Sequence, residues 1–194
     1  MYMFAIKGSD GEFAKKKCKE MLEEVGLAEV QNKKIGSFSG GMRQRIGIAQ
    51  ALLNEPSVLI RDEPTAGLDP KERIRFRNML CALSKERIII YATHIVSDIT
   101  FLADRVLIMK DGKIVADGSP EELMEIAVGK VWSVNVKRSE LSRVQAQYSV
   151  GTITDGENGS VNVRIVSESK PFDDAVNVKP ELDDVYLYFF GEVS

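Results

Sequence analysis

Two short, uninterrupted apolar runs set the strongest limit on how this chain folds. Residues 57–60 and 87–93 are rich in Ile, Leu and Val and are too short for helices. Such runs are typical of strands that are buried on both faces of a parallel sheet. A helical pattern over 71–83 separates them, and a parallel pair needs a crossover of that kind. We therefore expect an α/β fold built on a parallel sheet.

Apolar residues at helical spacing predict two helices before the first run, over 13–25 and 41–53. After the second run we expect a helix over 95–102 and then a hairpin that turns at Asp111-Gly112, because these residue types tolerate a positive φ. Ser119, followed by proline and two glutamates, predicts a capped short helix.

The sequence changes character near Gly129. From Lys130 onward, strand-like alternation is divided by the Gly-rich turn DGENG and by a helix-like SELSRVQAQ. We therefore predict two domains. Residues 1–128 would form the first, and residues 129–194 would form a small α/β appendage.

Composition excludes several classes of function. The net charge is −3, whereas nucleic-acid-binding domains usually carry a basic excess. The two cysteines, Cys18 and Cys81, lie far apart, which excludes a disulfide scaffold and a thiolate zinc site. His94 is the only histidine, so a site with several histidine ligands is impossible. No apolar run approaches the roughly 20 residues of a membrane-spanning helix.

An anion site is indicated where the helix over 41–53 begins. Ser39, Gly40, Gly41 and Met42 stand at its amino end. The unpaired N–H groups there carry partial positive charge, and glycines let a phosphate approach them closely. The alternative reading is a plain helix cap beside a flexible hinge, and for these residues alone that alternative is the stronger one.

Polar residues also follow both apolar runs. Asp62 and Glu63 come directly after the first, and His94 follows the second. Ligands of open α/β sheets bind at the carboxyl ends of the strands. There an aspartate can hold Mg²⁺ through water, a glutamate can orient an attacking water, and an imidazole can contact a phosphate. The alternatives are a polar turn and a structural histidine.

In this order, the motifs strongly resemble those of the nucleotide-binding subunits of ABC transporters. The ending over 179–192 is similar to tails of bacterial subunits that pair with separate exporter-type membrane proteins. The remaining resemblance covers residues 1–128. The matches are the helical subdomain at 13–38, the signature at Ser39-Gly40-Gly41-Met42 (with methionine where glutamine is commonest), the Walker B strand at 60–63, the D-loop at 66–69 and the switch histidine at 93–94.

The resemblance implies a partial P-loop NTPase lobe of the ABC ATPase type, with part of its helical subdomain, followed by the appendage. It also implies an ATP-binding subunit that couples ATP hydrolysis to transport by separate permease subunits, at the inner face of the cell membrane. Family members form head-to-tail dimers that enclose two ATP molecules. The second partner would therefore be another ABC ATPase subunit.

The family's roles carry over to particular residues. Ser39, Gly40, Gly41 and Met42 would contact the nucleotide of the partner subunit. In the chain's own site, Asp62 would hold Mg²⁺ through water, Glu63 would orient the attacking water and His94 would contact the γ-phosphate. Asp69 would couple the two sites across the dimer interface.

Two departures from the family stand out. The chain holds no GxxxxGK[ST] loop, which in the family cradles the phosphates. We therefore expect a truncated domain that binds ATP weakly or not at all by itself, with an exposed sheet edge that favours aggregation. Arg61 stands in the Walker B strand where the family has an aliphatic residue. It shares a strand face with Glu63 and is expected to reach it; alternatively, it is a drifting position.

Two other classes of function remain open. One is a non-catalytic remnant or interaction module that offers only its signature face, residues 39–42, to a partner. The absent phosphate loop favours that class. The other is an ABC-type ATPase of DNA repair or translation, but such relatives use long coiled coils or tandem lobes. The net negative charge of this chain argues against nucleic acid as a partner.

Overall fold

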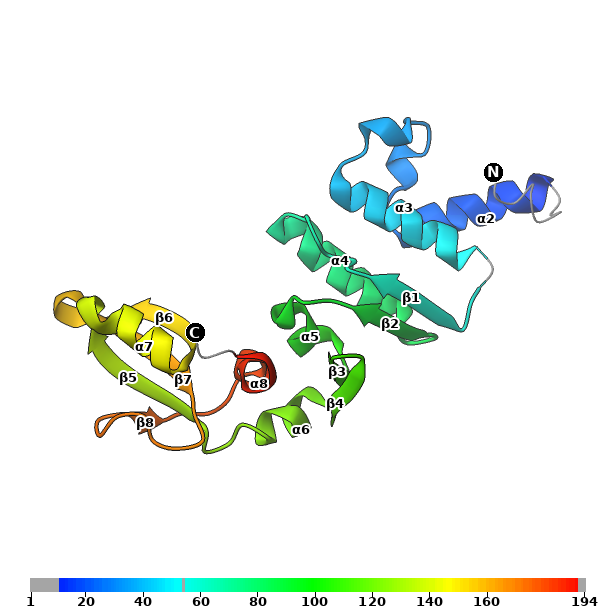
Figure 1. Cartoon of the computed structure of the whole chain (residues 1–194). Helices are drawn as coiled ribbons and strands as arrows, with labels where there is room; N and C mark the ends of the chain where they lie inside the picture. Colours follow the sequence, from blue (N-terminus) through cyan, green and yellow to red (C-terminus); the bar gives the residue numbers. More distant parts are fainter. Residues whose placement is uncertain (1–10, 54, 192–194) are drawn as a thin grey trace. The chain divides into compact units, whose positions relative to one another are not determined.

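The computed structural model describes residues 11–53 and 55–191. The chain forms two compact units, residues 1–94 and 95–194, and each has its own arrangement of helices and strands (Figure 1). The described elements of the first unit are α2 (Gly11–Glu24), η1 (Ala28–Val30), η2 (Ile35–Ser37), α3 (Gly40–Leu52), β1 (Val58–Asp62), α4 (Pro70–Leu83) and β2 (Ile88–Ala92).

The helices of the first unit begin and end at the residues that their sequences favour. Gly26 follows α2 with a φ of 66°, a conformation that glycine adopts without strain. Ser39 caps α3, and Asp69 caps α4 with Pro70 in its first turn. The helices predicted over 13–25, 41–53 and 71–83 therefore form within two residues of the expected bounds.

β1 and β2 form the expected parallel pair, in register from Val58 opposite Ile88 to Asp62 opposite Ala92. Only one face of this pair is covered by the described residues, so the prediction of strands buried on both faces is wrong for this structure. Leu59 is 3% exposed, whereas Ile60 beside it is 71% exposed. The side chains on the open face alternate with the covered ones, as a period of two requires. The apolar members of that open face are Val58, Ile60, Ile88 and Ile90.

The second unit contains a hairpin and a four-stranded antiparallel sheet. The sheet order is β6-β7-β5-β8, and the hairpin pairs β3 with β4 around Asp111 and Gly112, both at positive φ as its turn requires. Its elements are α5 (Val96–Leu102), β3 (Val106–Lys110), β4 (Lys113–Gly118), α6 (Pro120–Glu125), β5 (Val131–Lys137), η3 (Arg138–Glu140), α7 (Leu141–Gln147), β6 (Ser149–Asp155), η4 (Glu157–Gly159), β7 (Ser160–Val166), β8 (Val176–Asn177) and α8 (Leu182–Phe190).

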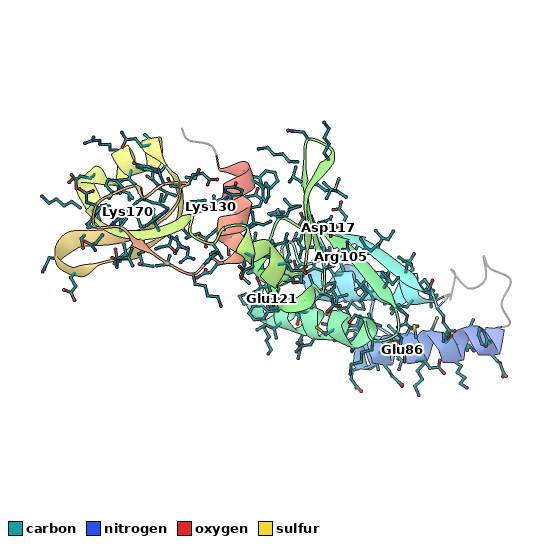
Figure 2. The ribbon with its side chains drawn as sticks, turned by 90° about the horizontal axis from the view of Figure 1, so that it is seen from below. Glu86, Arg105, Asp117, Glu121, Lys130 and Lys170 are labelled. Carbon is teal, nitrogen blue, oxygen red and sulfur yellow. The ribbon has the colours of Figure 1, made fainter. Side chains whose placement is uncertain are left out.

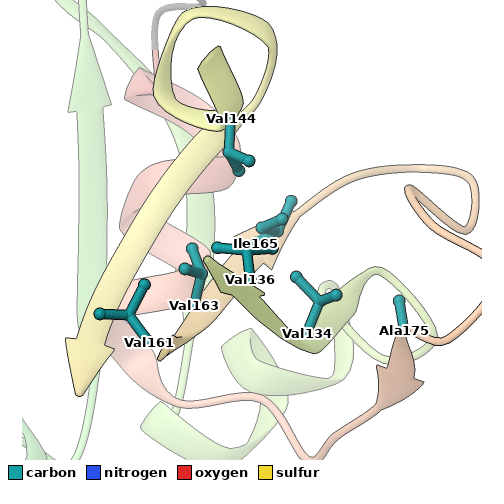
Figure 3. Close-up of a cluster of buried hydrophobic side chains, with 7 residues drawn as sticks. All are labelled: Val134, Val136, Val144, Val161, Val163, Ile165 and Ala175. Atoms are coloured by element: carbon teal, nitrogen blue, oxygen red, sulfur yellow. The ribbon is translucent and has the colours of Figure 1, made fainter. Parts of the chain in front are cut away.

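Two clusters of buried apolar side chains hold the second unit together. One lies between the four-stranded sheet and α7, and Figure 3 shows the side chains that form it: Val134, Val136, Val144, Val161, Val163, Ile165 and Ala175. The other joins α6, the start of β5 and α8 through Leu123, Ala127, Val131, Leu182 and Val185. Alternating residues of β5 and β7 enter these clusters, which explains the period of two in their sequences.

Charged pairs add to the packing of the second unit. Arg164 on β7 donates to both carboxylate oxygens of Asp184, which is 1% exposed in the first turn of α8. At the base of the hairpin, Arg105 donates to both oxygens of Asp117, at 2.7 and 2.8 Å, and Figure 2 shows the two residues side by side. The second pair is exposed, so we expect it to contribute little stability.

The second apolar cluster crosses the domain boundary that the sequence suggests. Leu123 and Ala127 precede position 128, whereas Val131 follows it. The division into 1–128 and 129–194 therefore stays a prediction. It marks where the segment that resembles the family is expected to end. None of the helices in the described ranges is long and apolar enough to cross a bilayer.

Candidate functional site

The amino end of α3 has the geometry expected of a helix that can meet an anion. Ser39 has an extended backbone and its Oγ accepts the N–H of Met42 at 3.2 Å. A serine hydroxyl that accepts one bond still has its proton to donate. Gly40 and Gly41 form the first turn, where backbone N–H groups lack partners inside the helix. The four predicted residues therefore form one segment at a helix start.

Gly41 also has a role in the packing of α3 against α4, which the sequence did not reveal. A Cβ at this position would lie 3.1 Å from the Cβ of Glu72, a tight contact, and 2.5 Å from its Oε2, so the Glu72 carboxylate would have to move. At Gly40 a Cβ would lie 3.9 Å from the carbonyl oxygen of Gly67, an ordinary contact. The absence of a side chain at Gly41 thus lets α3 and α4 come together.

Glu63 and His94 meet at the carboxyl ends of β1 and β2. Because the two strands are parallel and Asp62 pairs with Ala92, the residues that follow them leave the sheet at the same edge. Oε1 of Glu63 lies 2.7 Å from Nδ1 of His94 and accepts the backbone N–H of His94 at 3.1 Å. Thr93 donates its hydroxyl to Oε2 at 3.4 Å.

This arrangement determines what Glu63 and His94 can do chemically. The hydrogen bond from His94 lowers the pKa of the Glu63 carboxyl below its ordinary value, so Glu63 is ionised at neutral pH. An ionised carboxylate only accepts hydrogen bonds, so Nδ1 donates and Nε2 stays available for another group. A carboxylate of lowered pKa is a weak base, so it is better suited to orienting a water than to deprotonating it.

Asp62 is the last residue of β1, and its side chain is exposed at the same edge. In the described ranges, no group of three His, Cys, Asp or Glu residues lies close enough to hold a metal ion without other ligands. A Mg²⁺ ion usually keeps several waters and takes one or two carboxylates together with phosphate oxygens. Asp62 fits that kind of shared site, and the remaining ligands would come from water and nucleotide.

Asp69 caps α4 by accepting the N–H of Glu72 at 2.9 Å. Before it the chain makes a tight turn in which Gly67 has a φ of 72°, a conformation that favours glycine. Thr65 and Leu68 are buried in this turn, while Asp69 itself is exposed. Asp69 therefore has a structural role as a cap, and its predicted role in a dimer interface stays a prediction.

Arg61 does not pair with Glu63, contrary to what their shared strand face predicts. Its Nη2 donates to Oε1 of Gln44 on α3 at 2.7 Å. Within the described ranges, its buried Nε finds no hydrogen-bond acceptor. Gln44 on α3 supplies the acceptor, whereas Glu63 turns out of the strand with a φ of 43°.

The predicted residues thus fall into two groups, one around Ser39 and Asp69 and one around Glu63 and His94. Sequence reasoning missed Arg45 and Glu72, which form a largely buried ion pair at 2.9 Å between α3 and α4. They are 27 residues apart, so no spacing rule within a single helix could have paired them.

Comparisons with known proteins agree with this reading of the motifs. Residues 8–66 match the family model described as ABC transporter. An uncharacterized ABC transporter ATP-binding protein of Bacillus subtilis, YxlF, is 43% identical over 128 residues, which are 64% of this chain and 43% of YxlF. A second protein of that kind and organism, YhcH, is 35% identical over 81% of this chain and 51% of YhcH. That similarity therefore reaches beyond residue 128.

Solved structures give the same answer. CbiO1 of Clostridium perfringens, described as part of the ABC transporter complex CbiONQ, has a TM-score of 0.58 and 34% sequence identity, over 62% of this chain and 49% of CbiO1. The chain spans between 43% and 51% of the length of these three proteins. In its motifs, its α/β fold and these matches, the chain is similar to the ATP-binding proteins of ABC transporters.

Proposed function

We propose that this chain acts as an ATP-binding subunit of an ABC transporter, in which ATP hydrolysis drives transport by separate membrane subunits. The observation that carries the proposal is the pair of Glu63 and His94 at the carboxyl ends of two parallel strands, 2.7 Å apart. Ligands of parallel sheets bind at that edge. The family match over residues 8–66 supports a nucleotide as the ligand.

The proposed chemistry is phosphoryl transfer to water. Glu63 orients the attacking water through the oxygen that His94 does not occupy, and His94 offers Nε2 to the γ-phosphate. Mg²⁺, held by Asp62 through water, would neutralise charge that develops on the phosphate oxygens. Ser39, Gly40, Gly41 and Met42 contact the nucleotide of a partner subunit, and Asp69 lies beside them.

The proposed partners are a second ABC ATPase subunit and transmembrane permease subunits. CbiO1 of C. perfringens is part of a transporter complex, and the present chain is 34% identical to it. Through such permease subunits the chain would lie at the cytoplasmic face of the cell membrane. We propose no nucleic-acid partner, because the net charge is −3.

We further propose that the 194-residue chain by itself binds MgATP weakly or not at all. Its sequence holds no GxxxxGK[ST] loop, which supplies the backbone cradle and the phosphate-binding lysine in P-loop proteins. Isothermal titration of the full chain with MgATP tests this expectation. Binding with a micromolar Kd would contradict it.

The catalytic roles are tested in a background that supplies the rest of an ATPase domain. The segment of this chain that matches YxlF over 128 residues replaces its counterpart in YxlF, and the chimera is compared with its own variants. Glu63→Gln is expected to lower kcat about 100-fold while MgATP still binds, because it removes the charge that orients the water. Glu86→Gln, an exposed residue between α4 and β2, is the matched control. A Glu63→Gln chimera that keeps the parent's kcat contradicts the proposed role.

A non-catalytic interaction module is the second candidate, and the missing phosphate loop is the observation that favours it. In that case the chain offers only residues 39–42 to an intact ATPase subunit. The chain would then raise ATP hydrolysis by that subunit, and Ser39→Ala would abolish the increase while Glu63→Gln would leave it unchanged. Loss of the increase in both variants would contradict this second candidate.

A further inference from the structure

Arg45 joins three helices of the first unit. It lies in the second turn of α3 and is 8% exposed. Its Nη2 donates to Oε2 of Glu72 on α4 at 2.9 Å. Its Nη1 lies 3.3 and 3.4 Å from the carbonyl oxygens of Val25 and Gly26 after α2, and its Nε lies 3.4 Å from that of Gly41. The guanidinium thus connects the start of α3 to the start of α4.

Glu72 continues this connection to the cap of α4. Its backbone N–H donates to Oδ1 of Asp69 at 2.9 Å, while its side chain reaches back to Arg45. Its second carboxylate oxygen accepts a bond from Arg75 at 3.1 Å. Each oxygen of the Glu72 carboxylate therefore has a cationic partner, as a charge that is only 16% exposed requires.

The contact with Glu72 explains why residue 41 is glycine. A side chain there would displace the carboxylate, because a Cβ would stand 2.5 Å from Oε2. The first turn of α3 is therefore fitted against the first turn of α4. Both helix starts carry partial positive charge, and the Glu72 carboxylate between them offsets their repulsion.

We propose that Arg45 and Glu72 are positioning residues that couple the Ser39–Met42 segment to Asp69. A change in the cap at Asp69 then alters the order of the Ser39–Met42 segment, and an anion held by that segment alters the cap. That the anion is a nucleotide phosphate rests on the proposed function. The coupling between the two caps rests on the contacts alone.

Amide hydrogen exchange of the full chain tests the coupling directly. The N–H of Met42, bonded to Ser39, and the N–H of residue 72, bonded to Asp69, report the two caps. Glu72→Ala is expected to speed the exchange of Met42 at least about tenfold, because local opening controls exchange. The amide of Ile88, which donates to the carbonyl oxygen of Ser57 at 2.9 Å in the same unit, is the internal reference and is expected to change much less.

Two further variants separate positioning from a general loss of stability. Glu72→Gln keeps an acceptor for Arg45 in the same place, so the exchange of Met42 is expected to return most of the way to its original rate. Asp69→Ala is expected to speed exchange at Met42 in the original chain but not in the Glu72→Ala background. Ser119→Ala, which removes the serine cap of α6 in the second unit, is the matched control and should leave Met42 unchanged.

The proposal is overturned if Glu72→Ala speeds exchange at Met42 and at Ile88 by the same factor, or if Asp69→Ala affects Met42 equally in both backgrounds. The same exchange measurement, repeated with an intact ABC ATPase subunit and MgATP, distinguishes a failure of the proposed function from a failure of the proposed coupling. If nucleotide fails to slow exchange at Met42 while the coupling is present, the proposed function fails and the coupling stands. If nucleotide slows exchange at Met42 while the variants show no coupling, the coupling fails and the proposed function stands.

Discussion

Glu63 combines a strained backbone with a hydrogen bond to a histidine. Its φ of 43° is unusual for a residue other than glycine, and its backbone N–H donates to the carbonyl oxygen of Ala92 at 2.9 Å. Strain of this kind persists only where the surrounding contacts hold it. Here the contacts with His94 and Thr93 do so, and they fix the direction of the carboxylate.

The lowered pKa of Glu63 leads to a prediction about pH. A group whose pKa is lower in the folded state stabilises the fold above its unfolded value, about 4.3, and that stability is lost as the pH falls through the folded pKa. We therefore expect Glu63→Gln to reduce the loss of stability below about pH 4.3. Urea unfolding at a series of acidic pH values measures this. Equal pH dependence in the two proteins would contradict the prediction.

Arg61 gives a prediction about stability. Its Nε has no acceptor within the described ranges, and an unmet buried donor costs about 1–3 kcal/mol. The bond to Gln44 recovers only part of that cost. Arg61→Leu is therefore expected to raise the free energy of unfolding by about 1 kcal/mol. Lys71→Leu, at an exposed position on α4, is a control for the loss of one charge, and a lower Tm for Arg61→Leu would contradict the prediction.

Among the secondary-structure elements, the parallel pair β1–β2 stands out because the described residues cover only one of its faces. A parallel sheet is normally covered on both faces, and two strands alone are marginally stable. In the described residues the pair has helices on one face, while Ile60, Ile88 and Ile90 are each more than half exposed on the other. Exposed apolar surface of this kind favours self-association.

Substitutions on the two faces of β1 test this description. Ile60→Thr is expected to change the free energy of unfolding by about 0.5 kcal/mol or less and to reduce self-association. Leu59→Thr is the matched substitution on the covered face and is expected to cost about 3 kcal/mol. Unfolding curves and light scattering provide the two readouts. Equal destabilisation by both substitutions would show that Ile60 is buried.

At the scale of the whole molecule, each unit has its own buried side chains. Ile48, Leu52 and Phe76 belong to the first unit, and the two clusters around Ile165 and Val131 belong to the second. A unit with its own core can in principle fold alone.

We accordingly expect residues 95–194 to fold as a separate fragment. Val163→Ala, at a position that is 0% exposed, should lower the free energy of unfolding of this fragment by about 2 kcal/mol, since it opens a cavity in the core. Val176→Ala, at a position that is 63% exposed, is the matched control. Chemical denaturation followed by Trp132 fluorescence measures both. A fragment without a cooperative transition would contradict the prediction.

The sequence by itself determined the helices, the parallel pair and the hairpin at Asp111. These depend on local patterns such as helical spacing, caps and turn residues, which act within a few residues of the chain. The sequence also placed Glu63 and His94 at the same edge of the sheet, because parallel strands end together there, but the bond between them came from the structure.

Only the tertiary structure decided which side chains pair over long distances and which strand face is covered. Arg61 bonds Gln44 rather than Glu63, and Arg45 finds Glu72 across 27 residues. β1 carries apolar residues on both faces, so its pattern could not show that the described residues cover only one. Such contacts depend on how separate elements pack, and no local periodicity encodes that packing.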